Sequence, residues 1–384
     1  MPRTFKNLYP RITSFSNLLL AAKKAQAGKR YQENVLAFNF NLERELFRLQ
    51  EELRSRSYQP GPYRDFMVWD SKPRLISAAP YRDRVVHHAL INVIEPLFDP
   101  MFISDTYACR KGKGTHAALF GFREFLSRQR YVLKCDIQKY FPSIDHEILL
   151  GKLQRKISDR DTLWLFETII GSREFTNHAT ISVLSRGDRP VAPTPRYYPG
   201  DDLFTPLERK RGLPVGNLTS QFLANLYLND FDHWLKEELR VGPYLRYVDD
   251  FCIFGDEKAR LNEVKARIQT YLDGLRLSLH ERKSRVYTIQ EGVEFLGFRH
   301  LPGRTRIRKE NVKRFKLRMR KLERDYADGV IPLSRVSDSV VSWVAHASYA
   351  NCEELKKELF SCFAFVKTGS RDPARRGVAA ALGG

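Results

Sequence analysis

The chain has 384 residues, a length that exceeds one ordinary core and predicts two or three subdomains. Lysine and arginine number 65 against 45 aspartates and glutamates, which gives a formal net charge of +20 at pH 7. Basic residues spread along the whole chain indicate a polyanionic partner, with nucleic acid first, although such a charge can also serve solubility alone. No window approaches 18 uninterrupted apolar residues, so no membrane span is expected. The five cysteines show no CxxC spacing, which predicts reduced thiols in a cytosolic protein.

The first 60 residues predict helices. Leucines recur at steps of three and four between positions 42 and 53, with glutamate and arginine on the other face. After a break rich in proline and glycine, FMVWD at 66–70 predicts a strand, and YRDRVVHHALINVIEPLF at 81–98 predicts a long helix.

The middle of the chain predicts short strands joined by turns. Residues 131–150 predict a strand, a turn and a helix. LRYVDDFCIFG at 245–255 predicts two strands in a tight hairpin whose two-residue link is Asp249 and Asp250. Residues 173–211, rich in Pro, Arg and Gly, predict a long loop or insertion. Because helices and strands mix without regular βαβ alternation, the predicted fold class is α+β.

The C-terminal part predicts basic helices. Residues 309–326 carry an apolar stripe at steps of three and four, while lysine and arginine fill most of the other positions. A second helical stretch is predicted over about 334–366, and the tail 367–384 is expected to be disordered.

Three carboxylates indicate chemistry. Asp249 and Asp250 are adjacent between apolar runs, where they repel each other unless a cation is present. Asp136 ends the predicted strand YVLKC and adds a carboxylate from a distant segment. Mg²⁺ takes few protein carboxylates and borrows substrate phosphates, and two such ions about 3.5–4 Å apart catalyse phosphoryl transfer. In a basic protein this predicts nucleotide polymerisation. The alternatives are a solvated acidic turn and, for Asp136, a helix N-cap.

Several motifs together resemble a known family. DIQKYFPSIDH, GLPVGNLTSQFLANLYL, YVDD, HERKS and FLGF occur in the order and rough spacing of reverse transcriptases, and KPRLISAAPYRDRVVHHAL resembles the motif that precedes them. LPVGNLTSQ, with Ser-Gln where most members have Ser-Pro, resembles most closely the enzymes of bacterial diversity-generating retroelements. The resemblance implies a right-hand polymerase: a helical extension over 1–60, fingers and palm over 61–305 with the insertion at 173–211, and a helical thumb over 306–366.

The resemblance also implies a role for each matching residue. The catalytic residues would be Asp136, Asp249 and Asp250. Together with the backbone carbonyl of Ile137, these would bind two Mg²⁺ ions, for which Mn²⁺ is an expected substitute. The residues expected to bind the dNTP are Arg74, Phe141 (as a steric gate against ribose), Val215, Lys283 and Lys72. The expected nucleic-acid contacts are Arg110, Lys111, Lys113, Gln221, Lys313, Arg314, Lys316 and Arg320.

One departure from the family pattern concerns Val215. Retroviral and group II intron relatives usually have glutamine there, whose side chain contacts the sugar of the incoming nucleotide and braces Arg74. Valine cannot form a hydrogen bond, and losing such a contact costs roughly 1–3 kcal/mol of selectivity. The resemblance therefore implies an error-prone polymerase with errors at template adenines. The alternative is that Val215 only fills a gap.

These motifs imply an RNA-directed DNA polymerase that makes cDNA from a retroelement template RNA for mutagenic retrohoming. Its expected partners are the template RNA, the RNA/cDNA duplex, dNTPs and a pentameric accessory variability protein, in the cytoplasm of a bacterium and from a bacterial or phage gene. Two alternatives stay open. A retron-like or defence-associated reverse transcriptase would copy a dedicated noncoding RNA, which the length of 173–211 favours. An RNA-binding scaffold with an inactive palm is opposed by the three intact aspartates.

Overall fold

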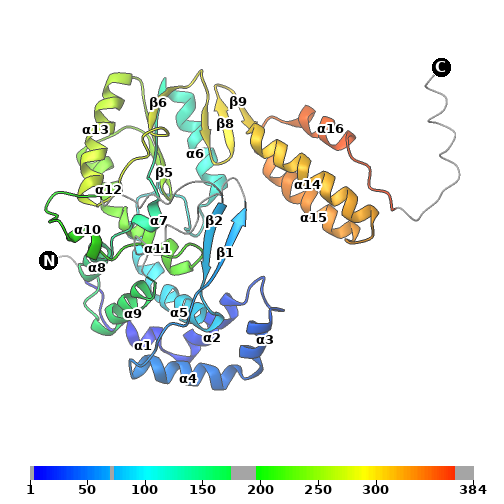
Figure 1. Cartoon of the computed structure of the whole chain (residues 1–384). Coiled ribbons are helices and arrows are strands. Elements are labelled where there is room, and N and C mark those ends of the chain that lie inside the picture. Colours follow the sequence, from blue (N-terminus) through cyan, green and yellow to red (C-terminus); the bar gives the residue numbers. More distant parts are fainter. Residues whose placement is uncertain (1–3, 70–72, 174–195, 368–384) are drawn as a thin grey trace, which may run out of the picture. The chain divides into compact units, whose positions relative to one another are not determined.

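The computed structural model describes residues 4–69, 73–173 and 196–367. The chain divides into two compact units, Met1–Gly121 with Leu133–Val286 (unit 1) and Phe122–Val132 with Tyr287–Gly384 (unit 2). Each unit combines helices with antiparallel strands, so the predicted α+β class is confirmed (Figure 1). Lys72, part of the predicted insertion and nearly all of the predicted tail lie outside the described residues.

Unit 1 begins with helices packed against α5 (Tyr81–Phe98), whose bounds match the prediction (Figure 1). The four helices before it are α1 (Tyr9–Ile12), α2 (Phe15–Ala25), α3 (Glu33–Phe40) and α4 (Leu42–Arg54). Leu46, Leu49 and Leu53 of α4 are buried, as their spacing predicts. α2 contacts both α4 and α5, so the first helices form an apolar layer around α5.

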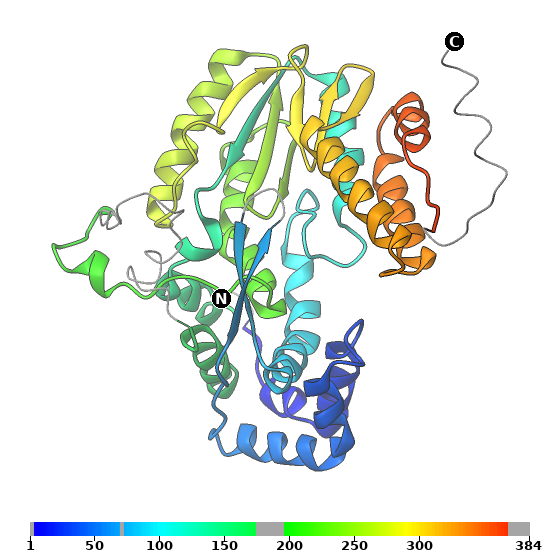
Figure 2. The same cartoon turned by 45° about the vertical axis from the view of Figure 1, so that its right-hand side comes forward.

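Strands β1 (Arg64–Trp69) and β2 (Pro73–Ala78) form an antiparallel hairpin that leads into α5. Figure 2 shows the two strands side by side, in darker blue, above the N-terminal helices. Most residues of β1 and half of those of β2 are exposed, so the hairpin presents many of its side chains to solvent.

A four-stranded sheet has the order β4-β5-β3-β6. Its strands are β3 (Tyr131–Asp136), β4 (Tyr244–Tyr247), β5 (Asp250–Gly255) and β6 (Arg285–Thr288). Strand β5 is buried from Phe251 to Phe254, which is the continuous apolar run of a central strand. Because β5 neighbours β3, segments more than a hundred residues apart in sequence meet in one sheet.

Eight further α-helices precede β6 in the described part of the chain. They are α6 (Thr115–Arg128), α7 (Tyr140–Ser143), α8 (His146–Gln154), α9 (Arg160–Gly171), α10 (Thr205–Glu208), α11 (Leu218–Tyr227), α12 (Asn229–His233) and α13 (Lys258–Gly274). Among them, α13 packs against β5. A 3₁₀ turn follows α5 (Asp99–Met101), and a π-helical turn follows α12 (Trp234–Glu238). Asp145 caps α8 by accepting the amide of Ile148, which satisfies one of the free N–H groups at the helix start.

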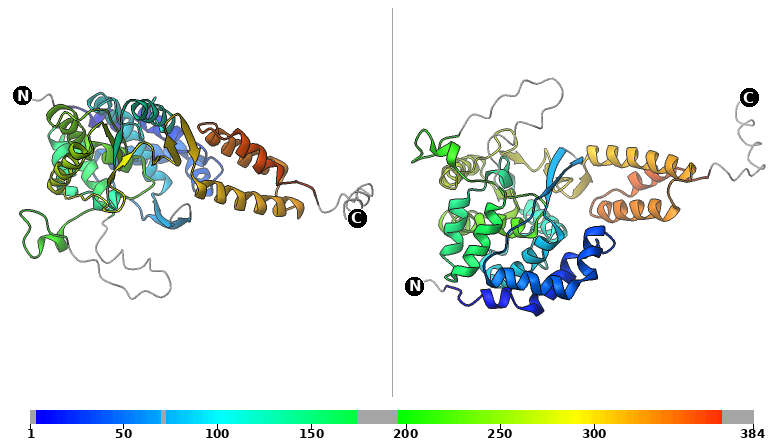
Figure 3. Two further views of the ribbon diagram at one scale, coloured as in Figure 1. Left: turned by 90° about the horizontal axis from the view of Figure 1, so that it is seen from above. Right: turned by 60° about the horizontal axis from the view of Figure 1, so that its bottom comes forward.

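Unit 2 joins a small sheet to three helices. The sheet has the order β7-β8-β9 and is antiparallel, with β7 (Val293–Phe295), β8 (Phe298–Leu301) and β9 (Arg304–Ile307). The helices are α14 (Lys309–Ala327), α15 (Leu333–Ala347) and α16 (Glu353–Ser361). Figure 3 shows α14 and α15 side by side, and Phe315 of the predicted apolar stripe stacks on Trp343 with ring centroids 4.2 Å apart. The second predicted helical stretch, about 334–366, contains two helices, α15 and α16, because the chain turns between them.

None of the helices within the described ranges combines the length and the hydropathy needed to cross a bilayer.

Candidate active site

Two of the predicted carboxylates lie where β4 turns into β5. Tyr247 pairs with Asp250, so the two-residue link is Val248 and Asp249, and Asp250 is the first residue of β5. The predicted Asp249–Asp250 link is therefore wrong by one position. Val248 has φ +60°, a conformation that β-branched residues rarely adopt. Contacts beyond the β4–β5 backbone ladder must therefore hold this turn.

The turn is joined directly to the end of β3. The amide of Ile137 donates to the carbonyl oxygen of Asp249 at 3.2 Å, and the amide of His280 donates to that of Asp136 at 2.7 Å. These backbone bonds bring Asp136 and Asp249, which are 113 positions apart, to one edge of the sheet. The ligand role predicted for the Ile137 carbonyl stays a prediction.

Two of the three aspartates, Asp136 and Asp250, are each paired with a lysine. Lys283 donates to both carboxylate oxygens of Asp136, at 2.7 and 2.8 Å. Lys134 lies 3.3 Å from Oδ2 of Asp250. The other oxygen of Asp250, Oδ1, is buried and has no hydrogen-bond partner among the described residues. The two lysines leave part of the negative charge uncompensated.

The pKa values of the two hairpin carboxyls reflect first their burial and then the charges around them. Burial raises the pKa of Asp249, and the charge of Asp136 raises it further, against the opposing charges of Lys283 and Arg74. Burial and the neighbouring carboxylates also raise the pKa of Asp250, to about 6, although Lys134 opposes the shift. Both groups would be more stable in their charged form if a cation lay beside them.

The carboxylates suit a hard cation but do not form a complete binding site by themselves. Among the described residues, no group of three or more His, Cys, Asp or Glu side chains is arranged to hold a metal ion. Both carboxylate oxygens of Asp136 accept hydrogen bonds from Lys283, so this lysine competes with any cation. Oxygen donors, the unpartnered Oδ1 of Asp250 and the raised pKa values nevertheless fit Mg²⁺, which takes its other ligands from substrate phosphates and water.

Backbone bonds connect the segments of three residues that are expected to bind the nucleotide, and one of the three, Arg74, lies near this edge. Arg74 on β2 is exposed and close enough to Asp249 to lower its pKa. The carbonyl oxygen of Val215 accepts the amide of Ser77, also on β2, at 3.2 Å, and Phe141 of α7 accepts the amide of Leu213 at 2.9 Å through its carbonyl. The loop that contains Val215 is thus bonded to both the strand of Arg74 and the helix of Phe141.

Arg110 has an internal role that the sequence did not indicate. Its Nε donates to Asp99 at 2.7 Å, its Nη1 to the carbonyl of Ile103 at 2.7 Å, and its Nη2 to the carbonyl of Asp99 at 3.1 Å. The side chain is only 8% exposed. Lys111, in contrast, is exposed, and Lys113 donates to the carbonyl of Ser104. The predicted nucleic-acid contact through Arg110 therefore gets no support from its placement.

Unit 2 contains a basic groove of about 610 Å³ along α14. Its lining includes five cationic side chains and an apolar floor: Arg306, Lys309, Lys313, Lys316 and Arg320 with Ile307, Val312, Leu317 and Leu355. Three of these, Lys313, Lys316 and Arg320, are predicted nucleic-acid contacts. Arg314 instead donates to Asn311. Gln221, also predicted, is half-buried on α11 of unit 1.

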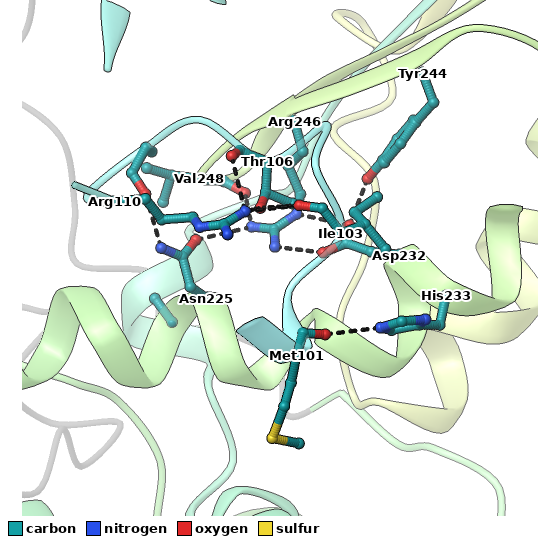
Figure 4. A network of polar contacts seen from close by, with 12 residues as sticks. Met101, Ile103, Thr106, Arg110, Asn225, Asp232, His233, Tyr244, Arg246 and Val248 are labelled. Atoms are coloured by element: carbon teal, nitrogen blue, oxygen red, sulfur yellow. Dashed lines mark hydrogen bonds and ion pairs between the residues drawn. The ribbon is translucent and has the colours of Figure 1, made fainter. Parts of the chain in front are cut away.

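Sequence reasoning missed the residues that support the carboxylates. Lys134 lies two positions before Asp136 on the same strand and therefore on the same face, a pattern that could have been noticed. Arg246 lies inside the apolar run of β4 and is fully buried against Asp232 (Figure 4). A buried arginine needs a partner, but nothing in the sequence names it.

An α+β fold that brings three carboxylates and two lysines to one sheet edge is typical of enzymes that transfer nucleotidyl groups. A family profile described as "Reverse transcriptase (RNA-dependent DNA polymerase)" matches residues 65–300. The chain therefore belongs to the reverse transcriptase family, and its enzyme class is RNA-directed DNA polymerase.

Individual relatives agree with this family. Protein YkfC of Escherichia coli is 25% identical over 302 residues, which cover 68% of this chain and 72% of that protein. The group II intron-encoded protein LtrA of Lactococcus lactis is 22% identical over 201 residues, 51% of this chain and 29% of LtrA. Nuclear intron maturase 1 of Arabidopsis thaliana is 24% identical over 187 residues, 41% of this chain and 26% of the maturase. The chain thus spans most of YkfC but less than a third of the two intron proteins.

Proposed function

We propose that this reverse transcriptase copies the template RNA of a retroelement into cDNA by two-metal-ion nucleotidyl transfer. The observation that supports this most directly is the meeting of Asp136, Asp249 and Asp250 at one sheet edge, with more negative charge than Lys134 and Lys283 compensate. A polymerase needs such a group of carboxylates because its metal ions bind them together with the phosphates of the nucleotide.

In this proposal the aspartates and the Ile137 carbonyl hold two Mg²⁺ ions, or Mn²⁺ in their place. Bound there, the ions would acidify the primer 3′-hydroxyl and neutralise the leaving pyrophosphate. The protein's own side chains orient the nucleotide. Arg74, with Lys72, holds the triphosphate, and the ring of Phe141 excludes a ribose 2′-hydroxyl. Lys283, 43% exposed, has room to release Asp136 and turn to the phosphates.

The predicted fingers, palm and thumb divide the contacts with nucleic acid. In the thumb, the basic groove along α14 suits a phosphate backbone, because its cations attract phosphates without reading sequence. Lys111, Lys113 and Gln221 would add contacts from the fingers and palm. Binding of the RNA/cDNA duplex should therefore weaken steeply with salt.

Val215 supports the proposal that the enzyme is error-prone. A backbone bond from Ser77 of β2 to the Val215 carbonyl holds its loop against the strand of Arg74, which supports a position of Val215 beside the nucleotide where retroviral and group II intron relatives usually have glutamine. Without a side-chain hydrogen bond to the nascent pair, selectivity should fall by roughly tenfold to a hundredfold. Val215→Gln should reduce misincorporation opposite template adenine. An unchanged error rate would show that valine is not the cause.

A retron-like or defence-associated enzyme that copies a dedicated noncoding RNA is the second candidate, based on the length of residues 173–211. The genes beside this one separate the two. A template/variable repeat pair beside a variable-protein gene indicates the diversity-generating role, for which a pentameric accessory protein is the expected partner. A noncoding RNA without repeats indicates the other. A bacterial or phage gene and a cytoplasmic location stay predictions.

Primer extension on an RNA template, with Mg²⁺, dNTPs and product sequencing, tests the function. Asp249→Asn is the control. Products that require Asp249 and carry errors concentrated opposite adenines would support mutagenic retrohoming. Faithful products that require Asp249 would keep the polymerase and favour the second candidate. Extension that survives Asp249→Asn would refute the assigned centre.

A further inference from the structure

Arg246 occupies the centre of a buried network beneath the hairpin turn (Figure 4). Its Nε and Nη2 donate to the two carboxylate oxygens of Asp232, at 2.8 and 2.6 Å. Tyr244 donates its hydroxyl to the same carboxylate at 2.6 Å. The arginine and aspartate side chains are 1% and 0% exposed, so this ion pair is sealed from solvent.

The third guanidinium nitrogen reaches the turn itself. Nη1 donates to the carbonyl oxygen of Val248 at 3.0 Å and to Oδ1 of Asn225 at 3.2 Å. Asn225 is held in turn, because its amide donates to the carbonyl of Ala108 at 2.8 Å. The backbone of Arg246 is also fixed, since its amide and carbonyl bond to Asp105 and Tyr107. The donor that reaches Val248 therefore has little freedom to move.

Two consecutive carbonyls of the turn are thus held from different parts of the fold. Arg246 holds that of Val248, and the amide of Ile137 holds that of Asp249. Together they fix the peptide planes on both sides of Asp249. They also maintain the left-handed conformation of Val248, which a β-branched residue does not favour by itself.

A buried ion pair contributes little net stability compared with an apolar pair of the same volume, so stability alone does not explain this one. We propose that Arg246, with Asp232 as its anchor, is a positioning residue that sets the direction of the Asp249 carboxylate relative to Asp136. This inference rests on the proposed function of those carboxylates. Arg246 would act through geometry alone, because a polymerase centre tolerates little displacement of its metal ligands.

Arg246→Lys is the first test, because lysine keeps the charge but lacks the planar fork. One ammonium group can reach Asp232 or the Val248 carbonyl, but it cannot reproduce all four bonds. Arg246→Met combined with Asp232→Leu is the second variant, since it replaces the ion pair by apolar groups and avoids a buried unpaired charge. The matched control is Lys152→Met, which removes another buried cation, the partner of Asp230 on the same helix as Asp232.

Two readouts are measured on the full chain and corrected for the folded fraction from thermal unfolding. The first is the affinity for Mn²⁺ alone by calorimetry, and the second is kcat and KM for dNTP in primer extension. Both Arg246 variants are expected to bind Mn²⁺ about tenfold more weakly and to lose kcat by about 10- to 100-fold, with KM changed less than about threefold. Lys152→Met should change neither.

Variants that fold and match Lys152→Met in both readouts would overturn the inference, because Arg246 would then be only structural. If the apolar double variant does not fold, Arg246→Lys decides alone. If the wild-type protein shows no extension that depends on Asp249, the proposed function fails. The Mn²⁺ affinities would still decide whether Arg246 positions the carboxylates.

Discussion

Two ion pairs of unit 1, Arg246–Asp232 and Lys283–Asp136, lie beside the proposed catalytic turn and differ in almost every physical respect. Arg246–Asp232 is sealed from solvent, uses a bidentate fork and gains a further bond from Tyr244. Lys283–Asp136 joins one ammonium group to a carboxylate, with the two side chains 43% and 20% exposed. Arg246 lies next to the YVDD motif, and Asp136 and Lys283 both lie in family motifs, but the two pairs differ in their exposure to solvent.

The difference shows which charges belong to the scaffold and which belong to the reaction. Removing one partner of a buried pair leaves an uncompensated charge and costs about 3–5 kcal/mol. An exposed pair contributes about 0–1 kcal/mol, so it opens at little cost. A ligand for Mg²⁺ must be able to give up its lysine, whereas the support of the turn must not move. The predictions below test this division, from the largest expected effect to the smallest.

Asp136→Asn should abolish catalysis while leaving the fold intact. The variant removes a carboxylate from the reacting edge, so we expect kcat in primer extension to fall by at least about 10³-fold, roughly 4 kcal/mol. Its unfolding free energy in denaturant should change by less than about 1 kcal/mol, because the pair it breaks is exposed. A variant that unfolds, or one that retains activity, would contradict the division.

Asp232→Asn, in contrast to Asp136→Asn, should lower the stability of the fold. Arg246 would remain buried without a counter-charge, so we expect the unfolding free energy to fall by about 3–5 kcal/mol in denaturant titrations. Glu124→Gln, whose partner Arg128 is 66% exposed, is the control and should cost far less. Equal losses from the two variants would show that burial does not distinguish them.

The sequence predicted those features that depend on local pattern. The sequence pattern over 81–98 predicted α5 with its bounds, and the leucine spacing predicted the buried face of α4. The family resemblance identified Asp136, Asp249 and Asp250, and their meeting at one sheet edge agrees with it.

Features that depend on distant partners could not be predicted. The hairpin register was wrong by one residue because bonds from Arg246 and Ile137 hold the left-handed Val248, and turn propensities do not include such bonds. The sequence predicts Arg110 as a nucleic-acid contact and gives no sign of its internal bonds, because Asp99 and Ile103, which accept them, form no recognisable motif with it. Lysines and arginines reveal their burial only when their partners are known.

His87 extends the comparison to a single buried ionisable side chain. It lies in α5, fully buried, and its Nδ1 has no hydrogen-bond partner among the described residues. Burial, with the nearby His88 and Arg84, lowers the pKa of His87 from 6.5 to about 3. The unfolded chain therefore binds the proton first on acidification, so stability falls as pH drops from about 6.5 to about 3.

His87→Leu should remove this acid sensitivity. At pH 4.5 the native histidine costs up to about 3 kcal/mol relative to pH 7.5. The variant should therefore lose less unfolding free energy than the wild type between these two pH values, by up to that amount. Denaturant titrations at both pH values measure it. Exposed His116→Gln is the control and should follow the wild type. A wild-type-like acid loss in His87→Leu would refute the assignment.

Lys283→Gln tests the exposed pair with the smallest expected effect. The metal-free protein should lose no more than about 1 kcal/mol, because the ammonium group is largely solvated. Asp136 would then have no competing cation, so Mg²⁺ should raise the melting temperature at about three- to fivefold lower concentration than in the wild type. Lys236→Gln, which breaks a similarly exposed pair with Asp105, is the matched control and should leave the Mg²⁺ titration unchanged. A weaker Mg²⁺ response in Lys283→Gln would mean that the lysine helps to hold the carboxylate for the metal. In that case the Lys283–Asp136 pair would belong to the scaffold, as Arg246–Asp232 does.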